Sequence, residues 1–266
     1  MPPRQRPRTD LTEGIVDGVY KAYERRLQAD VLSAPVPRHV AIIMDGNRRF
    51  AESLGEEATA GHTHGKDKLE ELLGWCLQLQ IRVLTVFAFS TENLTRPKEE
   101  LEVLMDLFEE NFRRAGDDER VHRNRIRVRA LGQIDLLPKA VQEAISYAEE
   151  RTRGYDQYAF NLAVAYGGRQ EIVHAIRRIA ADAMQGTLQP ADIDESVVSR
   201  YLYTSDLPDP DLILRTSGEE RISNFLLWQL AYAELYFADV YWPGMRKLDF
   251  LRAIRSYQRR QRRFGT

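Results

Sequence analysis

The 266-residue sequence contains one cysteine and no long apolar run. That residue, Cys76, cannot form a disulfide within the chain, and it lies among leucines at helical spacing, so we expect a buried core thiol. No apolar stretch approaches the roughly 20 residues of a membrane span. The charged residues at the amino end are not followed by the apolar segment of a secretory signal. We therefore expect a cytoplasmic protein.

Two common nucleotide-binding motifs are missing as well. The sequence has no GxGxxG motif. Its stretch from Gly61 to Lys66 is one residue too short for a P-loop, and Asp67 stands where Ser or Thr would hold magnesium. The formal net charge of -2 at pH 7 argues against a nucleic-acid binder. A nucleotide-binding α/β protein is therefore only a weaker alternative.

Apolar segments alternate with amphipathic helical patterns along the chain. Strands are expected at 40–44, 81–89, 126–131, 158–165, 211–216 and 233–237. Helices are expected at 69–77, 97–112, 138–153, 169–179 and 192–201. This order predicts a single-domain α/β fold with a central, mostly parallel six-stranded sheet flanked by helices. Residues 1–37, with an amphipathic helix from Leu11 to Leu27, are expected to form an N-terminal extension to the main domain at 38–266.

The first expected strand ends in a polar segment that runs from Asp45 to Arg49. Open α/β folds bind their ligands at the carboxyl ends of the strands. Gly46 allows the backbone to approach a ligand, and Arg48 and Arg49 carry forked donors that suit phosphate oxygens. One carboxylate beside two guanidiniums fits a metal that bridges to a phosphorylated substrate. Taken alone, the segment is equally compatible with an Asp-Gly turn and solvated arginines.

Arginines also follow two other expected strands. Arg96 comes after the second strand, and Arg215 and Arg221 lie at and beyond the end of the fifth. Independent solvated loops would rarely converge in this way, so the pattern favours a ligand with more than one phosphate. Glu234 lies within an apolar strand and needs a partner there, for which a metal ion is one candidate.

Two of the expected helices carry apolar stripes. The stripe of the helix after Pro97 is either ordinary core or the lining of a hydrophobic tunnel, and it consists of Leu101, Leu104, Met105, Phe108 and Phe112. The helix that follows the paired glycines 167 and 168 is expected to turn four residues inward, namely Ile172, Val173, Ile176 and Ile179. The glycine pair itself either admits a phosphate or reflects tight packing.

Several longer motifs make the chain resemble the cis-prenyltransferases, the undecaprenyl diphosphate synthase family. The resemblance covers about residues 39–265. Its motifs lie at 44–49, 61–62, 88–93, 96–97, 166–169, 211–216, 218–229 and 231–237. The DDxxD motif of trans-type synthases is absent, since Asp117 and Asp118 have no third acid after them.

The resemblance implies a homodimer with a hydrophobic tunnel that adds isopentenyl diphosphate to an allylic diphosphate with cis double bonds. The primer would be farnesyl or geranylgeranyl diphosphate. The product would be a long polyprenyl diphosphate such as undecaprenyl diphosphate, the precursor of a glycosyl carrier lipid, and this lipid would bring the enzyme to the membrane periphery. The alternatives are a short-chain (Z)-prenyl diphosphate synthase and a non-catalytic partner subunit, which would be expected to lack Asp45.

The resemblance also implies roles for individual residues. Asp45 would hold Mg²⁺ against the diphosphate, and Glu234 would contact the metal. Asn93 is the family's proposed proton acceptor, but an amide is a poor base, so we expect it to orient the substrate or relay a proton. The allylic diphosphate would contact Gly46, Asn47, Arg48, Arg49 and His62. Isopentenyl diphosphate would contact Arg215, Arg221 and Ser223, and further substrate contacts would come from Phe50, Ser90, Thr91, Glu92, Leu94, Arg96 and Ile222.

The chain departs from the family pattern at three positions. Phe50 replaces a tryptophan and Leu94 another aromatic residue, while Ala58 stands where many members have a diphosphate-binding arginine. The loss of that arginine implies that the primer sits differently or has another length. Ala88 is small where a bulky residue would block the tunnel, which favours a long product. The family's Arg-x-Gly ending, at 263–265, would reach into the site of the partner subunit.

Overall fold

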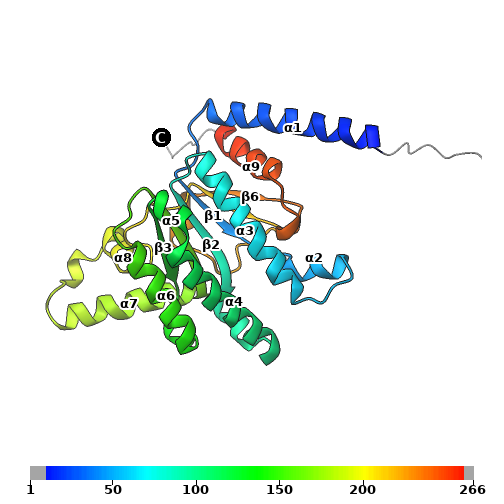
Figure 1. Cartoon of the computed structure of the whole chain (residues 1–266). Helices are drawn as coiled ribbons and strands as arrows, with labels where there is room; N and C mark the ends of the chain where they lie inside the picture. Colours follow the sequence, from blue (N-terminus) through cyan, green and yellow to red (C-terminus); the bar gives the residue numbers. More distant parts are fainter. Residues whose placement is uncertain (1–9, 261–266) are drawn as a thin grey trace, which may run out of the picture. The chain divides into compact units, whose positions relative to one another are not determined.

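The computed structural model describes residues 10–260, with side chains from residue 18 onward. Its contacts divide the chain into two compact units, one of residues up to 36 together with residues from 246, and one of residues 37–245. The larger unit contains a six-stranded sheet in the order β3-β4-β2-β1-β5-β6 (Figure 1). The strands are β1 (His39–Ile43), β2 (Val83–Ser90), β3 (Ile126–Leu131), β4 (Tyr158–Tyr166), β5 (Leu212–Arg215) and β6 (Glu234–Phe237).

All neighbouring strands in the sheet are parallel, as expected from the sequence. Every residue of β1 is buried, because a strand in the middle of a parallel sheet is covered on both faces. The last residue of β1, Ile43, lies between Phe87 of β2 and Arg215 of β5. The register therefore brings the polar segments that follow these three strands to one edge.

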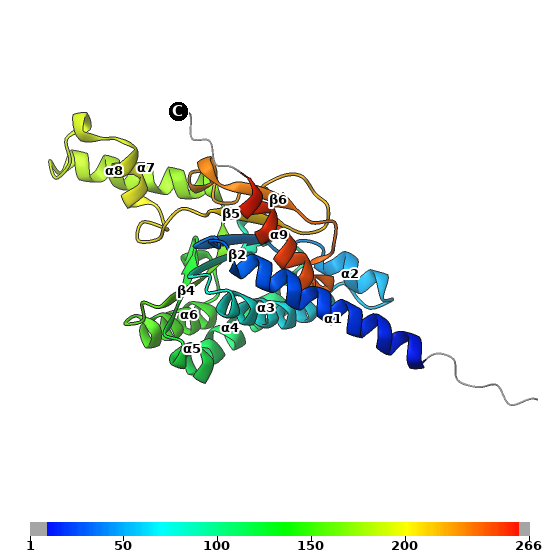
Figure 2. The same ribbon diagram turned by 90° about the horizontal axis from the view of Figure 1, so that it is seen from above.

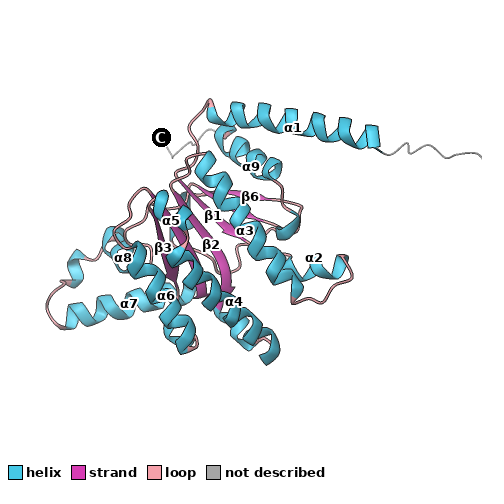
Figure 3. Cartoon of the chain, in the orientation of Figure 1, coloured by secondary structure: helices cyan, strands magenta, loops and turns pink. Residues whose placement is uncertain are grey.

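Helices flank the sheet. Figures 1 and 2 show α3, α4 and α6 over one face, and Figure 3 shows the strands behind them. The helices of this unit are α2 (Asn47–Ser53), α3 (Ala60–Gln78), α4 (Lys98–Asp117), α5 (Glu119–Arg123), α6 (Lys139–Thr152), α7 (Gly168–Met184) and α8 (Glu195–Tyr201). Short 3-10 helices lie at η1 (Thr91–Thr95), η2 (Ile134–Leu136), η3 (Pro190–Asp192), η4 (Gln229–Tyr232) and η5 (Trp242–Gly244).

The prediction that four apolar residues of α7 face inward is wrong for two of them. Val173 and Ile176 are 47% and 55% exposed. The buried residues include Ala175, Ile179 and a carboxylate, Glu171. Burial of Glu171 is tolerated because three donors reach it, namely the Tyr166 hydroxyl at 2.5 Å, the Tyr203 backbone N–H at 2.8 Å and the Gln229 side-chain amide at 3.1 Å. The helix is therefore oriented by a polar contact that an apolar pattern does not reveal.

The smaller unit pairs α1 (Asp10–Leu32) with α9 (Lys247–Arg259). The N-terminal helix is present as expected. Its apolar residues Val19 and Tyr23 are exposed, whereas Leu27 and Val31 are buried. Side-chain amides and ammonium groups join the two helices, as when Gln258 Nε2 donates to the Val31 carbonyl at 2.8 Å. The division into an extension at 1–37 and a domain at 38–266 stays a prediction.

None of the helices within residues 10–260 combines the length and the apolarity that crossing a membrane requires. Cys76 is buried in the core, as expected, and burial raises the pKa of its thiol.

A buried polar chain crosses the middle of the sheet at its amino end. His39 Nδ1 lies 2.7 Å from the Pro208 carbonyl oxygen, and Nε2 lies 2.8 Å from Thr85 Oγ1. The Thr85 hydroxyl in turn accepts a hydrogen bond from Asn161 Nδ2 at 3.1 Å. These partners assign the proton to Nδ1, so that the neutral ring donates at one nitrogen and accepts at the other. Burial lowers the pKa of His39 to about 4 from 6.5.

We expect His39 to make the fold sensitive to mild acid. The unfolded chain takes up a proton near pH 6.5 and the folded chain only near pH 4, so stability is lost as the pH falls through this window. Between pH 7.5 and pH 5 the loss should be roughly 2 kcal/mol. Urea unfolding of the wild type and of His39→Gln at both pH values tests this, because the variant lacks this contribution. Equal pH dependence in the two proteins would contradict it.

Candidate active site

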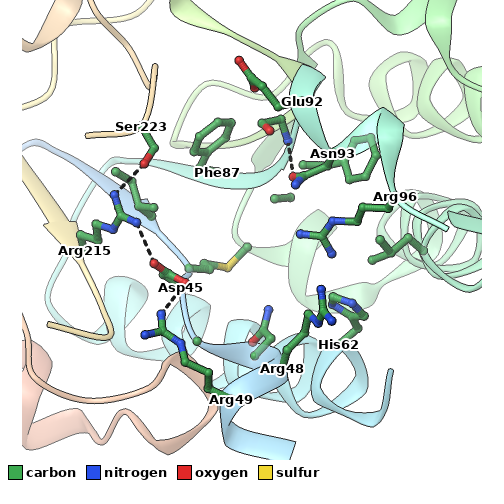
Figure 4. A pocket seen from close by; sticks show the side chains of 18 of the residues that line it. Asp45, Arg48, Arg49, His62, Phe87, Glu92, Asn93, Arg96, Arg215 and Ser223 are labelled. Atoms are coloured by element: carbon green, nitrogen blue, oxygen red, sulfur yellow. Dashed lines mark hydrogen bonds and ion pairs between the residues drawn. The ribbon is translucent and has the colours of Figure 1, made fainter. Parts of the chain in front are cut away.

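A polar cavity of about 800 Å³ lies at the carboxyl edge of the sheet. The segments after β1, β2 and β5 all contribute to it (Figure 4). The arginines expected from the strand ends line this one cavity: Arg48, Arg49, Arg96, Arg215 and Arg221. Other expected site residues line it as well, namely Asp45, Gly46, Asn47, His62, Ser90, Glu92, Asn93 and Ser223.

Asp45 occupies a fixed position between two of these arginines. Its backbone N–H donates to Thr216 Oγ1 at 2.9 Å. Its backbone carbonyl accepts a hydrogen bond from the backbone N–H of Trp242 at 2.9 Å. Its carboxylate accepts from Arg215 Nη2 at 2.7 Å and from Arg49 Nη2 at 3.2 Å (Figure 4). The backbone and the side chain are thus held by separate groups.

The carboxyl group of Asp45 is held in its ionised form. Burial alone would raise its pKa, but hydrogen bonds from Arg215 and Ser217 and the charges of Arg215 and Arg49 outweigh that effect. The pKa of Asp45 is therefore below its usual value. At neutral pH the site offers an anionic oxygen ligand beside several guanidiniums.

Arg215 is the most deeply placed of the site arginines, with only 4% of its surface exposed. Its Nη1 donates to Ser223 Oγ at 2.8 Å and to the backbone carbonyl of Arg221. Its Nε is buried and has no hydrogen-bond acceptor among the described residues. Glu219 pairs with two of the site arginines. Its Oε1 lies 3.2 Å from Arg49 Nη1, and its other carboxylate oxygen pairs with Arg221. Carboxylates thus hold these guanidinium groups beside the cavity.

A second group of donors lies on the other side of the cavity. Arg96 Nη1 and His62 Nε2 lie 2.7 Å and 3.2 Å from the same oxygen of Glu100. Arg48 Nη1 lies 4.0 Å from the other oxygen. The pKa of His62 is lowered, chiefly by burial and also by the positive charges of Arg96 and Arg48. The hydrogen bond and the charge of Glu100 would raise this pKa but do not outweigh these effects. Neutral His62 then donates from Nε2 to the carboxylate.

The Asn93 amide lies in the cavity with its oxygen already engaged. Asn93 Oδ1 accepts a hydrogen bond from the Ser90 backbone N–H at 2.9 Å within the capping box of η1. This contact leaves the Nδ2 group as the donor that faces other partners. The geometry supports an orienting role for Asn93 and gives no means for the amide to act as a base.

An apolar cavity of about 170 Å³ adjoins the polar one. Met44, Asn47, His62, Ala88 and Leu104 line both cavities. From there the apolar lining follows α3 and α4 and includes Leu69, Leu73, Leu107, Phe108, Phe112, Phe160 and Leu162. The stripe on α4 therefore lines a tunnel in part, through Leu104, Phe108 and Phe112.

Charged side chains surround the far end of this tunnel. Arg114 of α4 pairs with Glu70 of α3. Arg120 Nη2 lies 2.6 Å from Asp118 Oδ2 and 3.6 Å from Glu70 Oε2. All four residues line the cavity. Leu104 and Ala115 of α4 both line this cavity, and the helical rise between them is about 17 Å.

Some expected site residues lie elsewhere. Phe50, Thr91, Leu94 and Ile222 are not among the residues that line the polar cavity. Glu234 begins β6 opposite Leu212, whereas Arg215 lies opposite Phe237 at the other end of the strand. The distance along the strand is about 10 Å, and Glu234 is not among the residues that line the cavity. Its contact with a metal stays a prediction, and residues 263–265 lie outside the described part of the chain.

Glu100 and Phe87 are among the contributors that were not expected from the sequence. Glu100 was not singled out from the sequence, although its spacing of four residues from Arg96 allows a helical ion pair. Phe87 lines the polar cavity and stacks on Phe225 with ring centres 4.7 Å apart. The residue pattern of a strand does not distinguish an aromatic side chain that lines a cavity from one that packs in the core.

The residues present are suited to a magnesium ion shared with a substrate. Among residues 10–260 there is no cluster of three or more His, Cys, Asp or Glu that would hold a metal by itself. Mg²⁺ is commonly held by one or two carboxylates together with phosphate oxygens and water. Asp45 supplies one carboxylate with unused lone pairs, and the surrounding arginines are phosphate ligands. The donor set therefore fits a magnesium diphosphate.

The sequence matches a family model described as "Putative undecaprenyl diphosphate synthase" over residues 43–265. A Methanopyrus kandleri protein named tritrans,polycis-undecaprenyl-diphosphate synthase (geranylgeranyl-diphosphate specific) is 58% identical over 247 residues, which are 93% of this chain and 91% of the relative. A Methanocaldococcus jannaschii protein of the same name is 56% identical over 250 residues, or 93% and 89% of the two chains.

Two solved structures are also similar. Lavandulyl diphosphate synthase from Lavandula x intermedia, in complex with dimethylallyl diphosphate, has a TM-score of 0.83 and 41% identity over 87% of this chain and 99% of that one. A probable undecaprenyl diphosphate synthase from Campylobacter jejuni has a TM-score of 0.71 and 35% identity over 87% and 100% of the two chains.

Gly46 links the fold to the site in a way that can be tested. Its φ is +99°, and a Cβ there would lie 2.7 Å from Tyr241 Cδ1. Gly55 also has a positive φ, +74°, but has no atom within 4 Å of such a Cβ. Gly55→Ala should cost about 1 kcal/mol of stability from backbone strain alone. Gly46→Ala should cost about 2–4 kcal/mol, because the Tyr241 contact adds to the strain.

Urea unfolding and turnover of the two alanine variants check this expectation. Gly46→Ala should also lower turnover at least tenfold, since it displaces the adjoining Asp45, whereas Gly55→Ala should leave turnover unchanged. Similar losses in both variants would show that the contact with Tyr241 is unimportant.

Proposed function

The chain belongs to the undecaprenyl diphosphate synthase family of cis-prenyltransferases, and we propose that it extends geranylgeranyl diphosphate with isopentenyl diphosphate to a long polyprenyl diphosphate. That it is a prenyltransferase joining isopentenyl diphosphate to an allylic diphosphate follows from the family. The identity of the primer and the length of the product are the parts of the proposal that go beyond what the family implies.

The observation that carries the proposal is the junction of two unlike cavities. Arginines from three strand ends surround the polar cavity, and the apolar tunnel begins at its wall. A substrate with a diphosphate head and a hydrocarbon tail matches this division. Two groups of cationic donors, around Asp45 and around Glu100, provide for two diphosphates.

The chemistry that we propose begins with ionisation of the allylic carbon–oxygen bond. Negative charge develops on the departing diphosphate, and fixed guanidinium donors stabilise it. Arg48 and Arg49 would bind this diphosphate, and His62 would join them when a second proton at Nδ1 lets it donate to the diphosphate as well as to Glu100. Arg215, Arg221 and Ser223 would bind isopentenyl diphosphate. Mg²⁺, when bound by Asp45 and the diphosphate, would neutralise further charge on the leaving group. Asn93 would orient the alkene of isopentenyl diphosphate, which would form the new carbon–carbon bond to the allylic carbon. The extended chain would then lose a proton to an oxygen of the released diphosphate or to Asp45.

Geranylgeranyl diphosphate is the favoured primer because the names of the Methanopyrus kandleri and Methanocaldococcus jannaschii relatives specify it. Farnesyl diphosphate is the alternative. The absence of an arginine at Ala58 is compatible with a primer that is held differently from that of other members.

A long product is favoured by the small side chain of Ala88 at the junction of the cavities. The tunnel volume of about 170 Å³ is below the range of roughly 300–1,000 Å³ found for small-molecule pockets. A long chain would therefore need α3 and α4 to separate. Undecaprenyl diphosphate, and its use as a precursor of a glycosyl carrier lipid, remain proposals, as do the homodimer, the cytoplasmic location and the peripheral membrane association.

Asp45 should be indispensable for turnover. Asp45→Asn keeps the shape of the side chain but removes the charge, and we expect a loss of at least about 100-fold in turnover. Incorporation of labelled isopentenyl diphosphate into geranylgeranyl diphosphate in the presence of Mg²⁺ measures it. Asp206→Asn is the matched control, since Asp206 also bridges two arginines, Arg127 at 2.8 Å and Arg129, away from the cavity. Near-normal turnover in Asp45→Asn would contradict the proposed function.

Product length should depend on Ala88. Ala88→Leu fills the junction between the cavities, so we expect shorter products while the first condensation continues. Sizing the labelled products by chromatography tests this, with Val103→Leu on the exposed side of α4 as the control. If the wild type already stops after one or two additions, the short-chain alternative holds instead.

A further inference from the structure

Glu100 is a buried carboxylate just outside the polar cavity. It lies in the first turn of α4 and is 9% exposed. It is not among the residues that line the cavity, whereas its partners Arg48, Arg96 and His62 are. The carboxylate therefore contacts the cavity's donors without facing the cavity itself.

The three partners come from three different elements. Arg48 belongs to α2, His62 to the first turn of α3, and Arg96 to the loop between η1 and α4. Glu100 Oε1 receives hydrogen bonds from Arg96 at 2.7 Å and from His62 at 3.2 Å, and Oε2 is 4.0 Å from Arg48. One carboxylate is thus the common anchor of donors that the chain supplies separately, and Figure 4 shows these three side chains together on one side of the cavity.

The charge of Glu100 is kept despite its burial. Burial would raise its pKa, but the His62 hydrogen bond and the charges of Arg96 and Arg48 outweigh this, so the pKa is lowered. An ionised anchor binds guanidinium groups more strongly and with a more defined geometry than a neutral one.

We propose that Glu100 is a positioning residue that orients Arg96, Arg48 and His62 for the diphosphate of the allylic primer. The inference rests on the proposed function, which assigns Arg48 and His62 on this side of the cavity to the primer, and it adds Arg96 to them. Arginine side chains have many rotamers, and an anchor that selects one of them before binding reduces the ordering that the ligand would otherwise require.

A second effect of Glu100 opposes the first. Its negative charge reduces the positive potential of the cavity, and removing it would by itself attract a diphosphate more strongly. The two effects predict opposite results for Glu100→Gln. We expect the loss of positioning to dominate, because the charge lies behind the donors and is already offset by two guanidiniums.

The test compares Glu100→Gln with Glu99→Gln. Glu99 is the exposed neighbour in the same helical turn, so its substitution makes the same change of charge without touching the donors. We expect Glu100→Gln to raise the KM for geranylgeranyl diphosphate about tenfold and to leave the KM for isopentenyl diphosphate within about twofold. Glu99→Gln should alter neither. A KM for the primer that is unchanged or lower in Glu100→Gln overturns the proposal.

Two further measurements separate positioning from a loss of structure. Glu100→Asp keeps the charge and should recover part of the primer affinity. In an Arg96→Gln background, Glu100→Gln should add much less than tenfold, because the anchored group is gone. Full additivity, or an equal rise in both KM values together with a lower urea midpoint, overturns the positioning role.

Binding of inorganic diphosphate, measured by calorimetry, tests Glu100 independently of turnover. Weaker binding by Glu100→Gln than by Glu99→Gln supports the inference, and equal or tighter binding overturns it. If the wild type extends no primer at all, the proposed function fails, while this comparison still decides the role of Glu100.

Discussion

The ion pair between Asp45 and Arg215 joins the ends of two neighbouring strands, and the polar cavity depends on it. Both groups are partly or fully withdrawn from water, and each would be costly to bury without the other. Parallel pairing of β1 with β5 sets the distance between them. The pair keeps the Asp45 carboxylate ionised and holds the most buried guanidinium of the site in one orientation. The remaining donors are arranged around this fixed centre.

The sequence predicts the fold and most of the cavity for a simple reason. A parallel sheet brings the carboxyl ends of its strands to one edge, so the residues after β1, β2 and β5 meet there whatever the details of packing. The same reasoning does not place Glu234, because only the register shows that this residue starts its strand while Arg215 ends its own. Glu100 is missed because its burial follows from contacts with residues up to 52 positions away.

The spacing of apolar residues in the sequence predicts the buried face of a helix or strand least well where that face contains polar residues. The inward face of α7 is centred on Glu171, and the hydrogen bonds from Tyr166, Tyr203 and Gln229 make that burial possible. His39 is likewise buried inside an apolar strand because Pro208 and Thr85 satisfy both ring nitrogens. Apart from Tyr166, which lies close to Glu171 in the chain, these partners are at least 32 positions away in sequence, and no local pattern indicates them.

The helix α4 carries Glu100 in its first turn and the tunnel-lining residues Leu104, Phe108 and Phe112 along its length. Successive residues of a helix are turned by about 100° about its axis. One residue inserted between Glu100 and Leu104 would therefore rotate the anchor away from its donors or the aromatic rings away from the tunnel. Glu100 and the tunnel-lining residues are therefore held in one rotational register by the same helix. Insertion or deletion of a residue between Glu100 and Leu104 would separate the diphosphate site from the tunnel.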